Sequence, residues 1–276
     1  MNKPEYLRWI IKEDGVIKDN SIPLKCYRIE YNNDPDVLDD WALHIRRHYI
    51  PDDELEEDCT LLGLTSEEYL RASVIPQKNV HLGPTSRSNT ITEILISDLL
   101  EFVYGFHVPR IRQTNMSGTT VSEHGTDVIG YQFEKEDKTP SSKDKLVAAE
   151  VKAVLSKTDT SVIKSAVEDS VKDEYRVAQT LNYMRKKLKH YGKVEESKDI
   201  ERFQLKTKYD YSIFYVPAGI TSLAELDEVT VGEEKIHIIP EIDGNDLKLC
   251  HGNCIFFVHG KNLMKLTHEV FERCTK

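Results

Sequence analysis

A short apolar segment near the middle of the chain contains two side chains that could do chemistry. Residues 146–155 read LVAAEVKAVL, and the two charged residues of this segment are Glu150 and Lys152. Side chains alternate along a β-strand, so both charged groups would lie on one face. One interpretation is a simple ion pair on a solvent-facing strand. The other is a functional pair, because an ionisable group in so apolar a strand needs a partner or a function.

A further ionisable residue, Asp127, follows Gly125 and begins another apolar segment 23 positions before Glu150. By itself, an aspartate here is typical of an Asx-type turn at the start of a strand. Two carboxylates from neighbouring strands would instead form a hard-oxygen site suited to Mg²⁺, with Mn²⁺ able to substitute. Lys152 beside them could orient or help to deprotonate a water and offset the negative charge of a phosphoryl transition state. The pattern predicts a metal site for phosphodiester hydrolysis.

The elements that must position these residues alternate between helix and strand. Residues 90–104 place apolar side chains on one helical face, and 126–133 and 146–155 are expected to be strands. Residues 162–190 are expected to form one long helix or two in series. The remaining expected elements are strands at 108–113, 209–216, 236–239 and 254–258 and a closing helix at 263–274. This alternation predicts an α/β fold with a mixed or largely parallel sheet flanked by helices.

The beginning of the chain is more acidic than the rest. Residues 1–70 contain 17 acidic and 8 basic residues, within a total net charge of −10. The elements expected there are short strands at 6–11 and 24–31, a helix from Asp34-Pro35 to about residue 49, an acidic loop at 52–58, and a short helix with Thr65 and Glu68 at capping-box spacing. We expect two regions: 1–80, an acidic N-terminal α/β extension for partner docking or regulation, and 81–276, which carries the candidate site.

Taken in order, these residues resemble the metal-binding core of the PD-(D/E)XK nuclease superfamily. The core motif matches Gly125-Thr126-Asp127, with Gly-x-Asp where many members have Pro-Asp, followed by Glu150-Val151-Lys152. An acidic residue on a helix before the core strands corresponds to Glu93. The Gln-x-x-x-Tyr motif that RecB-type members carry on the next helix corresponds to Gln179 and Tyr183. The resemblance implies a restriction-endonuclease-like fold for 81–276, a nuclease domain.

Over most of its length the chain is also similar to the HamA family, described as AbpA-like, the nuclease subunits of the Hachiman antiphage defence system. This similarity implies an Mg²⁺-dependent DNA endonuclease with little sequence preference, in a complex with a HamB-like helicase subunit. The helicase would restrain the nuclease until it senses foreign or damaged DNA. The alternatives are a non-catalytic adaptor or regulatory subunit of a helicase, and an RNase that uses the same site.

The resemblance assigns a role to each candidate residue. Asp127 and Glu150 would hold Mg²⁺, and Glu93 would join them directly or through water. Lys152 would position the attacking water. The residues expected to order the site are Gln179 and Tyr183.

The role of Glu93 has a structural alternative. Thr90 and Glu93 have capping-box spacing, so Glu93 could simply cap its helix. In that case Glu101, on the same helix, would be the acidic residue of the site.

The stretch 176–193 contains six Lys or Arg residues and no acidic residue. In a nuclease, its basic side chains would contact backbone phosphates and give sequence-independent, salt-sensitive affinity. The residues expected to do so are Arg185, Lys186, Lys187 and Lys189. The alternative is a solvated helix end, where cations suit the helix dipole.

Several protein classes do not fit this sequence. No apolar stretch approaches the roughly 20 residues that a membrane span needs, and the N-terminus has no apolar signal-peptide core. The five cysteines are odd in number and scattered, which indicates a reducing cytoplasm rather than a disulfide framework. The sequence has no P-loop motif, so no nucleotide cofactor is expected. We expect a cytoplasmic protein without a membrane partner.

Overall fold

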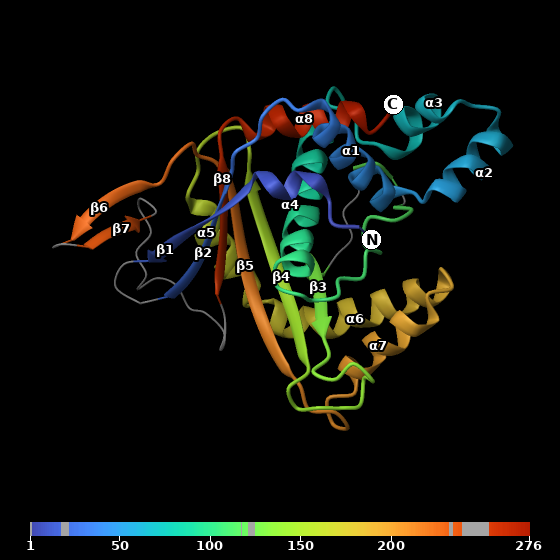
Figure 1. The fold of residues 1–276 in the computed structure, drawn as a ribbon. Coiled ribbons are helices and arrows are strands. Elements are labelled where there is room, and N and C mark those ends of the chain that lie inside the picture. Colours follow the sequence, from blue (N-terminus) through green and yellow to red (C-terminus); the bar gives the residue numbers. More distant parts are fainter. Residues whose placement is uncertain (1, 18–21, 117, 121–124, 232–233, 239–253) are drawn as a thin grey trace.

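A six-stranded mixed β-sheet forms the centre of the computed structural model, which describes residues 2–17, 22–116, 118–120, 125–231, 234–238 and 254–276 (Figure 1). The strand order is β1-β2-β8-β5-β4-β3, with bounds β1 Ile10–Ile17, β2 Ile22–Ile29, β3 Val128–Gln132, β4 Lys145–Val154, β5 Ser212–Ser222 and β8 Ile255–Gly260. Strands β2, β8, β5 and β4 run parallel to one another, whereas the edge strands β1 and β3 pair antiparallel with β2 and β4. Strands β6 (Asp227–Val231) and β7 (Glu234–Ile238) form a separate antiparallel pair.

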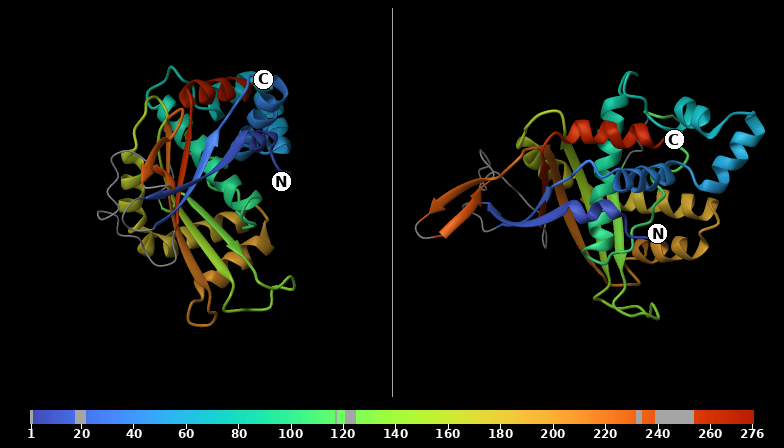
Figure 2. Two further views of the ribbon diagram at one scale, coloured as in Figure 1. Left: turned by 60° about the vertical axis from the view of Figure 1, so that its left-hand side comes forward. Right: turned by 45° about the horizontal axis from the view of Figure 1, so that its top comes forward.

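Helices cover both faces of the sheet (Figure 2). The first face carries α1 (Pro35–Tyr49), α4 (Gly83–Phe102) and α8 (Leu263–Arg273), which share one large apolar core with the sheet. The second face carries α5 (Ser161–Ser170), α6 (Asp173–His190) and α7 (Val194–Gln204) over two smaller cores. The remaining helical segments are the 3₁₀ helix η1 (Glu5–Trp9), α2 (Asp52–Leu62), α3 (Ser66–Tyr69) and the π-helical turn η2 (Leu70–Val74). The predicted α/β class and its helix-flanked mixed sheet are confirmed.

The apolar sequence of β4 follows from its position between two helical layers. Val147 and Ala149 belong to the core shared with α4, whereas Leu146 and Ala148 belong to the core under α6 and α7. A strand buried on both faces has no polar side to present, which explains why its sequence is a continuous apolar run. By the same alternation, Glu150 continues the face that α6 covers.

Local signals predicted two helix starts correctly. Asp34 caps α1 by accepting the Asp36 amide, with Pro35 at the first helical position. Thr65 and Glu68 form a complete capping box at the start of α3.

Three expectations about local structure are wrong. The acidic segment 52–58 is the beginning of α2, because acidic side chains stabilise a helix N-terminus. Segment 108–113 has irregular backbone, since Pro109 lacks an amide for a strand ladder. Residues 6–9 lie in η1, and the first strand begins at Ile10.

The N-terminal residues are integrated into the central sheet. β2 pairs with β8, so the first two strands extend the same sheet that contains β4. Tyr6, Trp41 and Leu95 belong to one buried core. The functional division near residue 80 stays a prediction, and both of its sides share one sheet and one core. In the described parts of the chain, no helix has both the length and the apolarity to cross a membrane.

Candidate active site

The candidate residues on β3 and β4 lie where these two strands separate. β3 begins at Val128, opposite Ala149, whereas β4 continues further. The Asp127 carboxylate, directly before β3, accepts a hydrogen bond from the Val151 amide (Oδ2···N 2.9 Å). Val151 lies beyond the end of the β3–β4 pairing, and the Asp127 carboxylate provides the hydrogen-bond acceptor for its amide. This bond brings Asp127 next to the Glu-x-Lys motif.

The turn before Asp127 requires a glycine. Gly125 has a φ of +118°, and a Cβ at this position would lie 2.5 Å from Thr180 Oγ1. The Thr180 hydroxyl accepts a hydrogen bond from the Thr126 amide at 3.0 Å, and the Thr126 hydroxyl donates to Asp173 Oδ1 at 2.9 Å. The Gly-x-Asp motif therefore packs directly against α6, which determines the position of Asp127.

Glu150 is buried, with 3% of its surface exposed, and it pairs with Lys152, whose side chain is 32% exposed. Lys152 Nζ donates to Glu150 Oε1 at 2.8 Å and lies 2.7 Å from Asp169 Oδ2 at the end of α5. Burial would lower the pKa of Lys152, but its hydrogen bonds to Asp169 and Glu150 outweigh burial and raise that pKa above its ordinary value. A lysine that stays charged can orient a water or a phosphate, but it cannot accept the water's proton.

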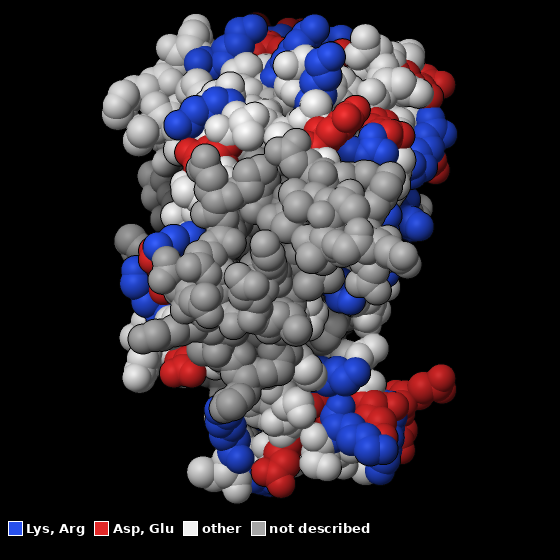
Figure 3. All heavy atoms as spheres, turned by 90° about the vertical axis from the view of Figure 1, so that its left-hand side faces the viewer, with Lys and Arg blue, Asp and Glu red and all other residues white. Residues whose placement is uncertain are grey.

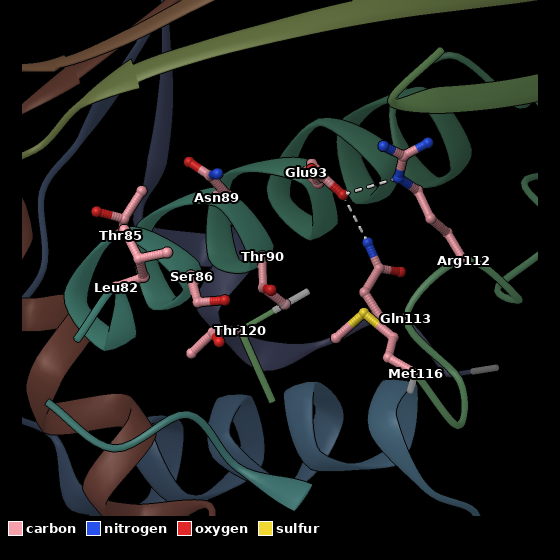
Figure 4. Close-up of a pocket in the computed structure, with 10 residues that line it drawn as sticks. All are labelled: Leu82, Thr85, Ser86, Asn89, Thr90, Glu93, Arg112, Gln113, Met116 and Thr120. Atoms are coloured by element: carbon pink, nitrogen blue, oxygen red, sulfur yellow. Dashed lines mark hydrogen bonds and ion pairs between the residues drawn. The ribbon is translucent and has the colours of Figure 1, made fainter. Parts of the chain in front are cut away.

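Glu93 lies on α4, and its carboxylate points toward Arg112 and Gln113 (Figure 4). Its Oε2 accepts a hydrogen bond from Gln113 Nε2 at 2.8 Å and lies 3.3 Å from Arg112 Nε. The same guanidinium group donates to Asp127 Oδ1 at 3.1 Å and to the Thr126 carbonyl oxygen at 2.7 Å. Arg112 therefore connects the acidic residue of α4 with the acidic residue that precedes β3.

The capping interpretation of Glu93 is wrong. α4 begins at Gly83 and not at Thr90, so Glu93 lies well inside the helix. Glu101, the alternative acidic residue, forms an ion pair with Arg110. Among the two acidic residues considered on this helix, Glu93 is the one that shares a cation with Asp127.

Four acidic side chains lie close together here, and we call Glu93, Asp127, Glu150 and Asp173 the acid cluster; Asp127 is partly buried and the other three are buried. Burial raises the pKa of Glu93 to about 8, and the charge of Asp127 contributes to this rise. Burial also raises the pKa of Asp127 and, together with repulsion from Asp127, the pKa of Glu150. The pKa of Asp173, on α6, is raised to about 7 by burial and by the charge of Glu150. Burial is the largest cause of each rise, and the nearby cations Arg112, Lys152 and Arg176 offset it only in part.

The acid cluster has the donor chemistry of a Mg²⁺ site. Glu150 Oε2 and Asp173 Oδ2 are buried and have no hydrogen-bond partner, whereas Mg²⁺ binds carboxylate oxygens together with waters and phosphate. Among the residues that the structure describes, no three His, Cys, Asp or Glu side chains converge as a complete ligand set. Arg112 contacts both Glu93 and Asp127 instead. The arrangement fits an ion held by few protein ligands.

α6 brings one of its two predicted residues to the acid cluster. Tyr183 lines a small cavity together with Asp127 and Arg112, and its hydroxyl accepts a hydrogen bond from Lys187 Nζ at 2.8 Å. Gln179 is exposed, and its role in ordering the site stays a prediction.

The predicted phosphate-binding residues of α6 have different surroundings. Lys187 Nζ also donates to the Arg112 carbonyl oxygen at 3.3 Å, so this side chain is turned toward the site. Lys186 and Lys189 are exposed, and Arg185 is partly buried. Their contact with DNA stays a prediction.

The residues at the site that sequence reasoning missed are Arg112, Gln113, Asp169, Asp173 and Arg176. Asp173 lies in the first turn of α6, where an acidic residue suits the helix dipole and gives no separate signal. Arg112 fell within a segment predicted as a strand. Arg176 Nη1 lies 3.8 Å from Glu150 Oε2. Its position at the start of the basic stretch 176–193 is the one signal that could have identified it.

Comparison with known proteins gives one family. A family model described as HamA matches residues 4–274, on both sides of the predicted division near residue 80. A search of curated proteins found no match.

Proposed function

Because the chain belongs to the HamA family, we propose that it is the nuclease subunit of a Hachiman-type antiphage defence complex. Its reaction would be Mg²⁺-dependent endonucleolytic hydrolysis of DNA with little sequence preference. The observation that carries this proposal is the meeting of Asp127 with the Glu150–Lys152 pair, beside a buried Glu150 oxygen that has no hydrogen-bond partner.

In the proposed reaction a water attacks the phosphorus, one phosphate ester bond breaks, and the leaving oxygen gains a proton. Bound Mg²⁺ would supply Lewis acidity and a more acidic water. Asp127 and Glu150 would hold the ion, with Glu93 as a third ligand, direct or through water. Charged Lys152 would orient the water and offset the negative charge of the transition state. The residues proposed to order the site are Gln179 and Tyr183.

DNA would approach over α6, where the stretch 176–193 combines basic residues without an acidic one. The residues proposed to contact backbone phosphates are Arg185, Lys186, Lys187 and Lys189. On the face at the opposite edge of the sheet, the described acidic and basic side chains are interspersed (Figure 3).

A helicase of the HamB-like type is the proposed partner, and it would restrain the nuclease until foreign or damaged DNA is sensed. α2 extends from the side of the molecule beside α3 (Figure 1). Its first turn is acidic, and its last two residues, Leu61 and Leu62, are 75% and 59% exposed. Exposed leucines next to acidic residues fit a partner surface that is apolar at its centre and basic at its rim. We call this feature the α2 surface and propose it as the docking site.

The test uses the purified complex with plasmid DNA. Glu150→Gln and Lys152→Met should each reduce Mg²⁺-dependent cleavage by at least about 100-fold, and they should leave folding and complex assembly intact. Lys145→Met, at the exposed start of the same strand, is the matched control and should cleave normally. Chelation of divalent ions with EDTA should abolish the activity.

Three outcomes would contradict the proposal. Undiminished DNA cleavage by both site variants would exclude this site. If the complex cleaves neither DNA nor RNA under any metal condition, the chain is a non-catalytic subunit. If it cleaves RNA alone, the chain is an RNase.

A further inference from the structure

The positively charged guanidinium group of Arg112 already contacts two residues of the acid cluster, Glu93 and Asp127. We propose that it is a resident counter-cation, which must leave Glu93 and Asp127 before a divalent ion can bind these two carboxylates. This inference rests on the proposed function and concerns the regulation of the same site.

All three nitrogens of the Arg112 guanidinium group have a partner at the site. Nε lies 3.3 Å from Glu93 Oε2, Nη2 donates to Asp127 Oδ1 at 3.1 Å, and Nη1 donates to the Thr126 carbonyl oxygen at 2.7 Å. The Arg112 side chain is 15% exposed. A planar guanidinium group with a fixed fork of donors is well suited to bridge two carboxylates. The oxygens that it occupies are the ones that Glu93 and Asp127 would offer to an ion.

The guanidinium group contacts only two members of the acid cluster, Glu93 and Asp127. On the other two members, Glu150 Oε2 and Asp173 Oδ2 are buried and have no hydrogen-bond partner. Lys152 and Arg176 lie near Glu150 but do not reach these two oxygens within hydrogen-bond distance. A divalent ion that binds them would also compete with Arg112 for Asp127 and Glu93.

The backbone that carries Arg112 is held from several sides. Arg110 Nη2 lies 2.7 Å from Asp98 Oδ1 on α4, and the Thr114 hydroxyl donates to the His48 carbonyl oxygen at 3.1 Å. Additional hydrogen bonds join the Asn115 amide to the Tyr49 carbonyl oxygen at 3.1 Å and Lys187 Nζ to the Arg112 carbonyl oxygen at 3.3 Å. These contacts hold the segment on both sides of Arg112, so displacement of the counter-cation is a swing of the Arg112 side chain.

The experiment measures metal binding by the purified chain without DNA. Free Mn²⁺ is followed by electron paramagnetic resonance for the native protein, Arg112→Gln, Arg112→Lys and Arg112→Gln/Glu150→Gln. Arg112→Gln should bind Mn²⁺ at least about tenfold more tightly than the native protein. Arg112→Lys should lie between the two, because an ammonium group keeps the charge but cannot span both carboxylates. The added Glu150→Gln change should remove the binding.

A second readout separates competition from general loosening of the fold. In EDTA, Arg112→Gln should have a lower Tm than the native protein, and Mn²⁺ should raise its Tm by more than it raises the native Tm. Arg28→Gln removes a guanidinium group that pairs with Glu13 and Glu30 outside the site. This control should leave Mn²⁺ affinity unchanged.

The outcomes distinguish this inference from the proposed function. Equal or weaker Mn²⁺ binding by Arg112→Gln, still dependent on Glu150, would overturn the counter-cation and leave the metal site standing. Absence of Mn²⁺ binding at millimolar concentration in every variant would overturn both.

Discussion

One carboxylate oxygen of Asp127 accepts a hydrogen bond from the main-chain amide of Val151 at 2.9 Å, and the other oxygen accepts one from Arg112 Nη2 at 3.1 Å. The first bond joins the turn before β3 to the strand that carries Glu150 and Lys152. The second bond involves the negative charge that a metal ion would use. Asp127 thus has a structural role, through its bond to Val151, and a proposed role in metal binding, through its charge. Different substitutions of Asp127 can separate the two roles.

Asp127→Asn keeps an oxygen acceptor for the Val151 amide but removes the charge. We expect a loss of about 1 kcal/mol of unfolding free energy, because Val151 keeps its acceptor but the ion pair with Arg112 is lost. Cleavage should be reduced by at least about 100-fold. Asp127→Ala leaves the amide unsatisfied and should cost about 1–3 kcal/mol in addition. Urea unfolding and a plasmid-nicking assay measure the two effects. Native-like cleavage by Asp127→Asn would exclude its proposed metal role.

Gly125→Ala should impair both stability and activity. Its φ of +118° disfavours alanine, and the new Cβ would lie 2.5 Å from Thr180 Oγ1, so the Thr126–Thr180 bond must shift. We expect a loss of about 1–3 kcal/mol of unfolding free energy and reduced cleavage, because that bond determines where Asp127 lies.

The matched control for this change is Gly63→Ala. Gly63 also has a positive φ, +66°, but a Cβ there would have nothing within 4 Å. This variant should lose about 1 kcal/mol and cleave DNA normally. If Gly125→Ala behaves like the control, the close packing of the turn on α6 has no role in the site.

His48 should make the protein less stable in acid. It is buried, and burial together with the charges of His44 and Arg110 lowers its pKa to about 3, although Asp98 opposes this shift. Between this value and the unfolded-state pKa of about 6.5, the unfolded chain binds a proton that the folded chain does not. Stability should therefore fall as pH decreases through this range, by about 1.4 kcal/mol per pH unit from this residue.

Urea unfolding at several pH values between about 4 and 7 tests this expectation against His48→Gln. The variant should show a slope with pH that is shallower by the contribution of one histidine. Val194→Gln, at an exposed residue that does not titrate, provides a control and should keep the native slope. Identical slopes for native protein and His48→Gln would refute the prediction.

The double change Leu61→Ser/Leu62→Ser tests the α2 surface. Because both side chains are exposed, unfolding free energy should change by less than about 0.5 kcal/mol. Affinity for the helicase, measured by surface plasmon resonance, should fall by at least about tenfold. Val194→Ser, an exposed apolar residue on α7, should bind the helicase like the native protein. If the native protein, the double variant and Val194→Ser all bind the helicase with equal affinity, the docking site lies elsewhere.

Point substitutions are required for this test because the N-terminal residues cannot be removed as a unit. Deletion of residues 1–80 would remove β1 and β2 from the central sheet and α1 from the main core. A loss of binding after that deletion would report unfolding and not docking.

Much of the fold could be predicted from local sequence patterns. The apolar run around Glu150 predicted β4, and Asp34 and Thr65 correctly marked the starts of two helices. These signals are readable because strand alternation and helix capping depend on residues only a few positions apart. The same locality explains the failures at 52–58 and 108–113, where acidic composition and short apolar spacing fit more than one backbone conformation.

The sequence by itself determined which residues could do chemistry on β3 and β4 and the order in which they occur. The tertiary structure decided which of them meet and what surrounds them: Arg112 between Glu93 and Asp127, and Asp173 buried beside Glu150. These neighbours are brought together by the packing of α4 and α6 around the end of the sheet, and no short-range periodicity encodes such contacts. Burial then sets their charge, because a carboxylate's pKa depends on the groups and the solvent around it rather than on its place in the chain.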